Sequence, residues 1–337
     1  MGLDERDKIK IFAGRHCIDL AKKICDRLDM PLGAARTEVF PDGELITYID
    51  EDVRGRDCFV VLSTCEPVNE NVMELLIFAD SLRRASAKRL TAVIPYYGYG
   101  RQDRKERGRT PITAKLIANM VTNAGFDRVL ALDLHAAQIQ GFFDIPVDHL
   151  SASPVLYRYF EEYRDTMGDI VVVSPDVGNV KVANEYADLL NVDLAIIDKR
   201  RHSADNVEFA NIVGDVKGRV VLMVDDIIST AGTVCSAANV VMEHGATDVI
   251  VATTHAVLSG PAVERLQSSP ISRMIVTNTI PRHTLAQKEI PSRDRFDGIQ
   301  DRITTLCVSG LFADAIHHIH HNLSVSSLFR QFAGSKR

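Results

Sequence analysis

The 337-residue sequence lacks several features that would each point to a particular class of protein. It has no apolar run of membrane-spanning length, and its first residues, M-G-L-D-E-R-D-K, are too charged for a secretory signal, so we expect a cytoplasmic protein. The formal net charge is -6, which gives no reason to expect binding of a nucleic acid polymer. Its 6 cysteines include no C-x-x-C pair, which favours scattered reduced thiols over a structural zinc site.

Two common nucleotide-binding motifs are also missing. Neither G-x-x-x-x-G-K-[ST] nor G-x-G-x-x-G occurs, so any nucleotide site must be of another kind. What is present is an ordinary globular mixture, with 46% hydrophobic and 25% charged residues. At roughly 150 residues per domain, the length favours two domains.

Short apolar, β-branched runs alternate with stretches of helical period along the whole chain. Examples are F-V-V-L, L-T-A-V-I, V-L-A-L, I-V-V-V, L-A-I-I and V-V-L-M-V. Strands that are apolar almost throughout suit a parallel sheet with helices on both faces. The pattern therefore predicts an α/β fold.

Two stretches also share one layout, which suggests an internal duplication. The first starts at Gly55 and the second, R-V-V-L-M-V-D-D-I-I-S-T-A-G-T, follows Gly218; each leads into a helix and a further strand. Prolines and small polar residues interrupt the pattern at 144–154. We therefore predict domains at 8–149 and 150–330, of which only the second carries the acidic pair.

Asp225 and Asp226 directly follow the apolar run V-V-L-M-V, so the pattern predicts them just beyond the carboxyl end of a strand. Ligands of open parallel sheets bind there. Adjacent carboxylates repel, so a sugar diol or a phosphate-bound magnesium ion is expected beside them. The small and hydroxylated residues 229–233 suit a phosphate at the start of a helix. A plain N-capped helix would explain one Asp or Ser but not the whole string.

Other strand ends carry polar side chains that could bind a magnesium ion. L-D-L-H places His135 after one predicted strand and S-P-D places Asp176 after another. Taken alone, a single histidine is more often a packing residue, and D-K-R-R-H at 198–202 more often a solvated turn. His317 and His321 have a metal-capable spacing, but no third ligand is evident, so we expect a polar helix face.

Several motifs resemble those of ribose-phosphate pyrophosphokinase, the ATP-dependent synthase of phosphoribosyl pyrophosphate, and they follow one another along the chain as in that family. They are D-D-I-I-S-T-A-G-T at 225–233, F-P-D-G-E at 40–44, V-I-P-Y-Y-G-Y-G-R-Q-D-R at 93–104, L-D-L-H-A-A-Q-I-Q-G-F-F-D-I-P-V-D at 132–148, V-V-V-S-P-D at 171–176 and I-I-D-K-R-R at 196–201. The resemblance covers nearly the whole chain. It implies two similar domains of the type I phosphoribosyltransferase fold, and transfer of the β,γ-diphosphoryl group of ATP to the C1 hydroxyl of ribose 5-phosphate.

The resemblance also implies a role for each motif. Lys199 and Arg201 would lie on a mobile catalytic loop, and His135 and Asp176 would bind Mg²⁺. ATP would contact Phe40, Asp42, Gly43, Glu44, Arg101 and Gln102. Ribose 5-phosphate would contact Arg201, Asp225, Asp226, Ser229, Thr230, Ala231, Gly232 and Thr233. The F-P-D-G-E loop would complete a neighbouring subunit's ATP site, which implies dimers assembled into a homohexamer.

Two departures from the family pattern bear on regulation and affinity. Ser229 stands where the family usually has a third acid, and the segment 104–113 is one residue shorter than in phosphate-activated members. The resemblance is therefore not extended to phosphate activation or ADP inhibition, on which the sequence makes no prediction. The rival hypotheses are a catalytically silent regulatory subunit, which the intact Lys199 and Arg201 argue against, and an ordinary phosphoribosyltransferase, which leaves F-P-D-G-E unexplained.

Overall fold

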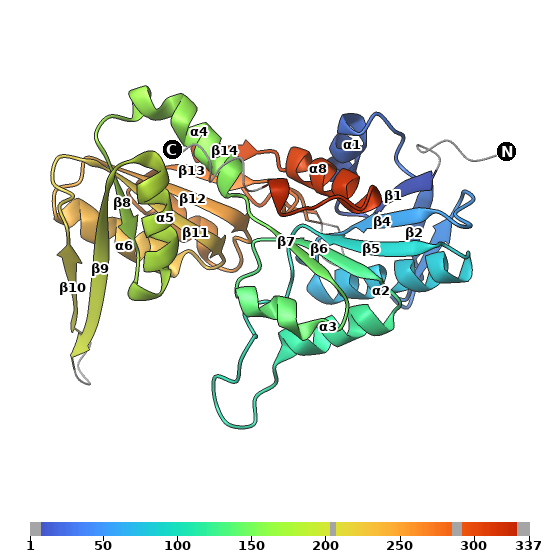
Figure 1. Cartoon of the computed structure of the whole chain (residues 1–337). Coiled ribbons are helices and arrows are strands. Elements are labelled where there is room, and N and C mark those ends of the chain that lie inside the picture. Colours follow the sequence, from blue (N-terminus) through green and yellow to red (C-terminus); the bar gives the residue numbers. More distant parts are fainter. Residues whose placement is uncertain (1–7, 203–206, 285–291, 329–337) are drawn as a thin grey trace. The chain divides into compact units, whose positions relative to one another are not determined.

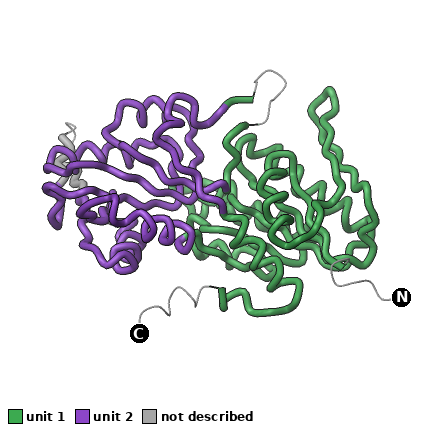
Figure 2. The backbone as a smooth tube through the Cα atoms, turned by 90° about the horizontal axis from the view of Figure 1, so that it is seen from above, with its two compact units in different colours: residues 1–152, 279–293, 308–337 green, residues 153–278, 294–307 purple. Residues whose placement is uncertain are grey.

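The computed structural model describes residues 8–202, 207–284 and 292–328 (Figure 1). The chain forms two compact units (Figure 2). The described residues within 1–152, 279–293 and 308–337 belong to unit 1, and those within 153–278 and 294–307 belong to unit 2. Each unit therefore combines segments that are distant in the sequence.

Unit 1 is built on a 5-stranded parallel sheet in the order β1-β4-β5-β6-β7. The strands are β1 (Ile9–Ala13), β4 (Asp57–Val61), β5 (Arg89–Ile94), β6 (Arg128–Leu132) and β7 (Val147–Leu150). A separate antiparallel pair is formed by β2 (Ala35–Val39) and β3 (Leu45–Ile49).

Helices cover both faces of this sheet. The elements are α1 (Ile18–Arg27), α2 (Val68–Arg84), α3 (Thr113–Asn123), the short 3-10 helix η2 (Ala137–Phe142) and α8 (Ser309–His320). Successive side chains of a strand point to opposite faces. Cys58 and Val60 of β4 accordingly pack in the core beneath α2 and α3, whereas Phe59 and Val61 pack in the core beneath α1 and α8. The near-continuous apolar run of β4 thus supplies two cores.

Unit 2 contains a 7-stranded sheet in the order β10-β9-β8-β11-β12-β13-β14. The strands are β8 (Ile170–Ser174), β9 (Asp193–His202), β10 (Val207–Val213), β11 (Val220–Ile228), β12 (Asp248–Ala256), β13 (Ile271–Thr277) and β14 (Ile303–Leu306). The β9–β10 pair is antiparallel and the remaining pairs are parallel.

The same alternation of side chains builds two cores in unit 2. Its helices are α4 (Ser153–Met167), α5 (Val180–Leu190), α6 (Gly232–Glu243) and α7 (Ala262–Gln267), with 3-10 turns η3 (Val177–Asn179) and η4 (Gln300–Arg302). Val221 and Met223 of β11 pack beneath α6 and α7, and Leu222 and Val224 pack beneath α4 and α5. The predicted α/β class, with mainly parallel sheets flanked by helices, is confirmed. None of the described helices is long and apolar enough to cross a membrane.

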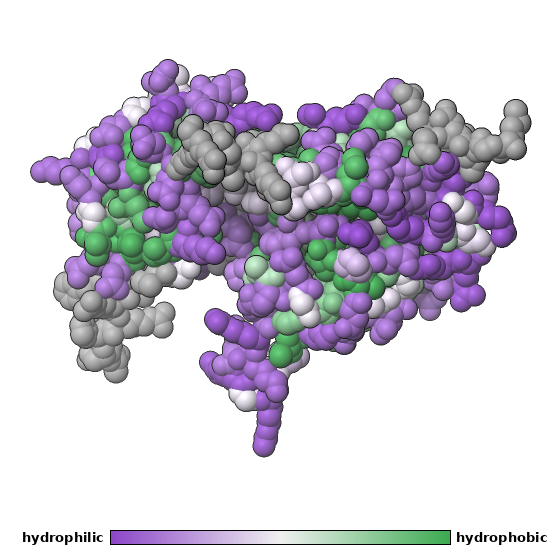
Figure 3. Space-filling model, viewed as in Figure 1, coloured by the Kyte–Doolittle hydropathy of each residue, from purple (hydrophilic) through white to green (hydrophobic). Residues whose placement is uncertain are grey.

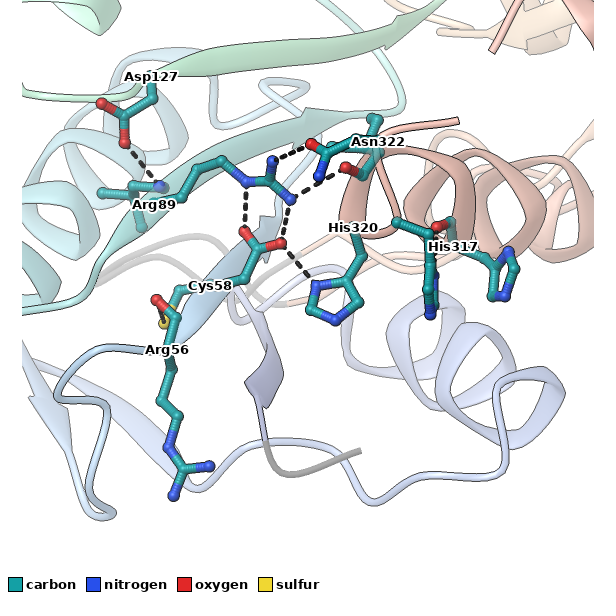
Figure 4. Close-up of polar contacts among 11 residues, drawn as sticks. Arg56, Cys58, Arg89, Asp127, His317, His320 and Asn322 are labelled. Carbon is teal, nitrogen blue, oxygen red and sulfur yellow. Dashed lines mark hydrogen bonds and ion pairs between the residues drawn. The ribbon is translucent and has the colours of Figure 1, made fainter. Parts of the chain in front are cut away.

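The last helix is attached to the sheet of unit 1 by a polar cluster (Figure 4). Asp57 accepts hydrogen bonds from Arg89 Nε at 2.9 Å and a further bond from Arg89 Nη2, and His320 Nδ1 lies 2.8 Å from its Oδ2. Burial opposes ionisation of Asp57, but its partners His320 and Arg89 outweigh burial and lower the pKa of the carboxyl. Arg89 also donates to the Ile319 carbonyl at 3.0 Å, so α8 is joined to β4 and β5.

Residues 101–112, the later part of the connection from β5 to α3, project as a loop whose exposed surface is hydrophilic (Figures 1 and 3). Seven of its first nine residues are charged, which is the reason that no apolar face holds it against the sheet. Arg101 and Gln102 open this loop.

Candidate active site

The acidic pair lies within a strand of unit 2. Because β11 runs on to Ile228, the expectation that the strand ends before Asp225 is wrong. The pairing of β11 with β8 ends at Leu222. The pairing of β11 with β12 continues through Asp225, which lies opposite Thr253. The backbone N–H of Asp226 donates to Asp225 Oδ1 at 2.9 Å, and Thr253 Oγ1 donates to the Asp226 carbonyl at 3.1 Å. The two carboxyl groups are therefore held on paired backbone.

The electrostatic state of Asp225 indicates a site that requires a positive or hydroxyl-bearing partner. Burial, and after it the neighbouring Asp226 and Asp176, raise the pKa of this carboxyl to about 8. A cation or a sugar diol at this position would stabilise the ionised form. The arrangement fits both of the partners expected from the sequence.

Residues 229–233 form the turn from β11 into α6. Ser229 Oγ lies 2.9 Å from Ser259 Oγ, and Ala231 adopts a left-handed conformation, with φ 57°, as the N-cap of α6. No side chain caps this helix, so its first N–H groups remain available to an anion. Thr230 and Thr233 are exposed, whereas Ala231 is 4% exposed. The loop thus offers backbone donors and small side chains, as a phosphate site requires.

Asp176 lies in the same unit, just beyond β8. Its Oδ1 accepts the Asn179 N–H at 3.0 Å, and its carbonyl accepts Ser174 Oγ at 2.7 Å. Asn179 Nδ2 donates in turn to the Val224 carbonyl at 2.7 Å, which connects this turn to β11. The fold of unit 2 therefore brings Asp176 close enough to Asp225 to influence the ionisation of Asp225.

His135 belongs to unit 1, in the turn after β6. Asp133 is strained, with φ 38°, and its Oδ2 accepts the Ala152 N–H at 3.1 Å. His149 Nε2 accepts the Leu134 N–H at 2.9 Å, and burial lowers the pKa of this histidine, which keeps Nε2 free to accept. His135 itself is exposed. The turn that presents His135 is therefore fixed by its neighbours.

The residues fit a magnesium ion only if substrate oxygens complete its shell. Across the part of the chain that the structure describes, no three His, Cys, Asp or Glu side chains gather into a group that could hold a metal. Magnesium commonly takes one or two protein ligands together with substrate phosphates and water. Asp176 and His135 are each exposed, so either side chain is accessible to an ion that also binds substrate oxygens.

The F-P-D-G-E motif forms the tip of the β2–β3 hairpin, as its turn signal predicts. Phe40 N–H donates to the Glu44 carbonyl at 2.8 Å, and Gly43 closes the turn with φ 98°. Phe40 is 44% exposed, which is unusual for an aromatic ring without a partner surface. Asp42 and Glu44 are exposed beside it.

Arg101 and Gln102 lie at the start of the hydrophilic loop of unit 1. Gln102 Oε1 accepts Thr113 Oγ1 at 2.5 Å, and the Gln102 carbonyl accepts the Ala114 N–H at 3.2 Å, so its position is fixed by the start of α3. Arg101 is exposed.

Lys199 and Arg201 lie on β9, where the sequence led us to expect a loop. Their backbones pair with Ala210 and Glu208 of β10, so the predicted loop segment continues the strand as one arm of a hairpin (Figure 1). The strand that pairs with this part of β9 is β10, with the sequence V-E-F-A-N-I-V. The run L-A-I-I alone does not predict such a partner. Residues 203–206 lie outside the described residues.

Several contacts of the candidate site were missed by reasoning from the sequence. Ser259, Arg265, Asn179 and His149 each hold a loop that carries a predicted site residue. They stand in no motif, and only the fold brings them to their partners. The one available signal was the S-G-P turn at 259–261, which predicts a bend but no contact.

Comparisons with known proteins show the family to which the chain is similar. Residues 9–125 match the N-terminal domain of ribose phosphate pyrophosphokinase, and residues 201–330 match the phosphoribosyl synthetase-associated domain. A ribose-phosphate pyrophosphokinase of Rhodopirellula baltica is 51% identical over 96% of this chain and 99% of its own. The corresponding protein of Clostridium tetani is 51% identical over 97% of this chain and 99% of its own.

A solved structure shows the same fold. The crystal structure of phosphoribosylpyrophosphate synthetase from Mycobacterium smegmatis superposes with a TM-score of 0.82 and 43% identity, covering 94% of this chain and 99% of that one. The fold and the matched family models together define an α/β enzyme with phosphoribosyltransferase-type domains.

The chain belongs to the ribose-phosphate pyrophosphokinase family. Its activity is that of a ribose-phosphate diphosphokinase, a transferase of nucleotide biosynthesis that produces phosphoribosyl pyrophosphate. The predicted family and enzyme class are thereby confirmed.

Proposed function

We propose an assignment of residues to the steps in which ATP gives its β,γ-diphosphoryl group to the C1 hydroxyl of ribose 5-phosphate. The observation that carries it is the pairing of Asp225, whose pKa is raised to about 8, with a small-residue loop at the start of α6. A sugar phosphate has a diol that can bind to Asp225 and an anion that can bind to the loop at the start of α6. AMP is the second product.

Asp225 and Asp226 accept hydrogen bonds from the ribose hydroxyls in this proposal. Backbone N–H groups and hydroxyls of residues 229–233 bind the 5-phosphate, with Arg201 as a further contact. Ser229 donates a hydrogen bond to the phosphate from the position at which the family usually has a third acid. The C1 hydroxyl then needs positioning more than a strong base, so no general base is assigned.

ATP is bound by residues of unit 1. Phe40 stacks on the adenine, and the exposed carboxylates of Asp42 and Glu44 accept hydrogen bonds from the base or its ribose. Gly43 permits the turn that presents them. Arg101 and Gln102 contact ATP from the loop after β5.

Charge stabilisation is assigned to Lys199 and Arg201, whose cations offset the negative charge that moves toward AMP in the transition state. His135 and Asp176 are assigned to Mg²⁺, which the family generally uses and which, when bound, neutralises charge on the phosphates. Each of these two residues would supply a ligand to the ion, which would help to neutralise the diphosphate.

We further propose a homo-oligomer of dimers, with a hexamer as the expected assembly, acting in the cytoplasm. The exposed ring of Phe40 supports shared sites, because a hairpin tip that stacks on a nucleotide bound by another copy would bury this ring in the assembly.

The assignment is tested by AMP formation from ATP and magnesium, with and without ribose 5-phosphate. AMP is expected only with the sugar phosphate, and Lys199→Ala is expected to lower kcat by roughly 10²–10³-fold, the usual cost of losing one transition-state charge contact. Arg200→Ala, which the proposal leaves without a role, serves as the matched control. Equal losses in both variants would show that the cations of this strand act collectively and would refute the assignment to Lys199.

A further inference from the structure

One segment of unit 2 holds the backbone carbonyls that lead into the proposed sugar-phosphate loop. The carbonyl of Ile228 accepts the N–H groups of Val257 at 3.0 Å and Leu258 at 3.1 Å. The carbonyl of Ser229 accepts the Ser259 N–H at 2.9 Å. These donors all belong to the bend between β12 and α7.

The carbonyl of Thr230 is held by a side chain. Arg265 of α7 donates from Nη1 to this oxygen at 2.9 Å. The same guanidinium nitrogen lies 3.2 Å from the place that a Cβ on Gly232 would occupy, so it also lies beside the first residue of α6. Three successive carbonyls, of residues 228–230, are thus tied to residues 257–265.

This pattern decides where the neighbouring N–H groups point. In a trans peptide the C=O of one residue and the N–H of the next lie on opposite sides. Tying the carbonyls of residues 228–230 to one side therefore turns the N–H groups of Ser229, Thr230 and Ala231 to the other side. Ala231, with φ 57°, then leads into the uncapped start of α6.

An anion-binding loop needs this arrangement. Its N–H groups must converge on the anion, while its carbonyl oxygens, which carry partial negative charge, must be turned away. Thr230 is exposed, so without Arg265 water would compete for its carbonyl and the peptide between Thr230 and Ala231 could rotate. The bend between β12 and α7 supplies backbone donors for the first two carbonyls but none for the third.

We propose that Arg265 is a positioning residue for ribose 5-phosphate, which holds the Thr230 carbonyl out of the phosphate site, and that Ser259 assists it. This inference rests on the proposed binding of the sugar phosphate at residues 229–233. Ser259 contributes both its N–H, bonded to the Ser229 carbonyl, and its hydroxyl, 2.9 Å from Ser229 Oγ.

The test is the steady-state kinetics of Arg265→Met, which keeps the apolar stem and removes the donor. The KM for ribose 5-phosphate is expected to rise about tenfold, the scale of one lost hydrogen bond to a charged donor, with the KM for ATP unchanged within about twofold. Arg265→Lys keeps a charged donor and is expected to recover most of the affinity. Ser259→Ala is expected to raise the same KM by about threefold.

Arg302→Met is the matched control. Arg302 is likewise an exposed arginine of unit 2 that donates Nη1 to backbone carbonyls, those of Leu266 at 3.2 Å and Ile271 at 3.3 Å. It does not bond to the loop at 229–233, so neither KM should change. A similar rise of KM in Arg302→Met, or a rise for both substrates in Arg265→Met, would overturn the proposal in favour of general destabilisation.

Thr233→Val separates this inference from the proposed function. If Thr233→Val raises the KM for ribose 5-phosphate and Arg265→Met does not, the loop binds the sugar phosphate but Arg265 does not position it. If neither variant changes this KM, residues 229–233 are not the sugar-phosphate site, and the inference falls together with that assignment.

Discussion

The buried carboxyl of Asp225, which the proposal assigns to ribose binding, lowers the stability of the ligand-free protein at neutral pH. Its carboxyl is buried beside Asp226 and near Asp176, and burial is the main reason that its pKa is raised to about 8. In the unfolded chain the same carboxyl would titrate near its ordinary value of 3.8. The folded, ligand-free protein therefore holds a proton that the unfolded chain has released at neutral pH.

This difference predicts a pH-dependent effect of Asp225→Asn. For a carboxyl with a raised folded pKa, stability is lost as pH rises from about 4 to about 8, because the unfolded state binds fewer protons in that range. Asparagine removes the loss. We expect Asp225→Asn to raise the midpoint of thermal unfolding at pH 8 by a few degrees, and to have little effect at pH 4.

The measurement is thermal unfolding in the presence of a chelator and without substrate. Asp165→Asn, at an exposed position on α4, is the control and should show no such trend. A midpoint that is unchanged at pH 8, or equally raised at both pH values, would contradict the expected burial of charge. The variant should also lose binding of ribose 5-phosphate.

At the scale of elements, α8 is joined to unit 1 by charge as well as by its apolar face. Phe312 and Ile316 are buried in the core that α8 shares with α1, and the Asp57–Arg89–His320 cluster closes the end of this helix (Figure 4). The side chains of Asp57 and His320 are each 9% exposed. Asp57 also forms an ion pair with Arg89, and a pair with so buried a carboxylate is costly to break from one side only.

Asp57→Asn is therefore expected to destabilise the protein by about 2–4 kcal/mol, since it leaves Arg89 without its carboxylate in a mostly buried site. Urea unfolding would measure this change. Asp80→Asn breaks the exposed i,i+4 pair with Arg84 and should cost no more than about 0.5 kcal/mol. Equal effects of the two substitutions would show that α8 is held by its apolar face alone.

At the scale of the whole molecule, the proposal that copies share ATP sites has a direct test. Phe40→Ala and Lys199→Ala should each be inactive alone, while mixing them after dissociation should restore activity. If one site takes Phe40 from one copy and Lys199 from another, random mixing of equal amounts restores about a quarter of the sites. Reassembly of the double variant Phe40→Ala/Lys199→Ala is the control. No recovery in the mixture would indicate that each chain builds its own site.

The domains predicted from the sequence and the two compact units divide the chain in different ways. The extents 8–149 and 150–330 stay a prediction about repeated halves of the chain. Compactness instead groups the described residues within 279–293 and 308–337 with those of the first 152 positions, and α8 of the second segment packs on α1. No local pattern reveals this, since an amphipathic helix has an apolar face but no label for the surface that it covers.

The sequence by itself determined the fold class, the family and the motifs of the site. Apolar runs such as V-V-L-M-V need a covering layer on each face of the sheet. The small and hydroxylated residues that follow Asp226 indicate a phosphate site. Only the tertiary structure decided that β11 continues through the acidic pair, that Lys199 and Arg201 lie in a strand, and that residues 257–265 hold the loop. Strand pairing and long-range hydrogen bonds depend on partners elsewhere in the chain, from 7 positions away for Arg201 and Glu208 to 35 for Thr230 and Arg265, and local propensity does not encode them.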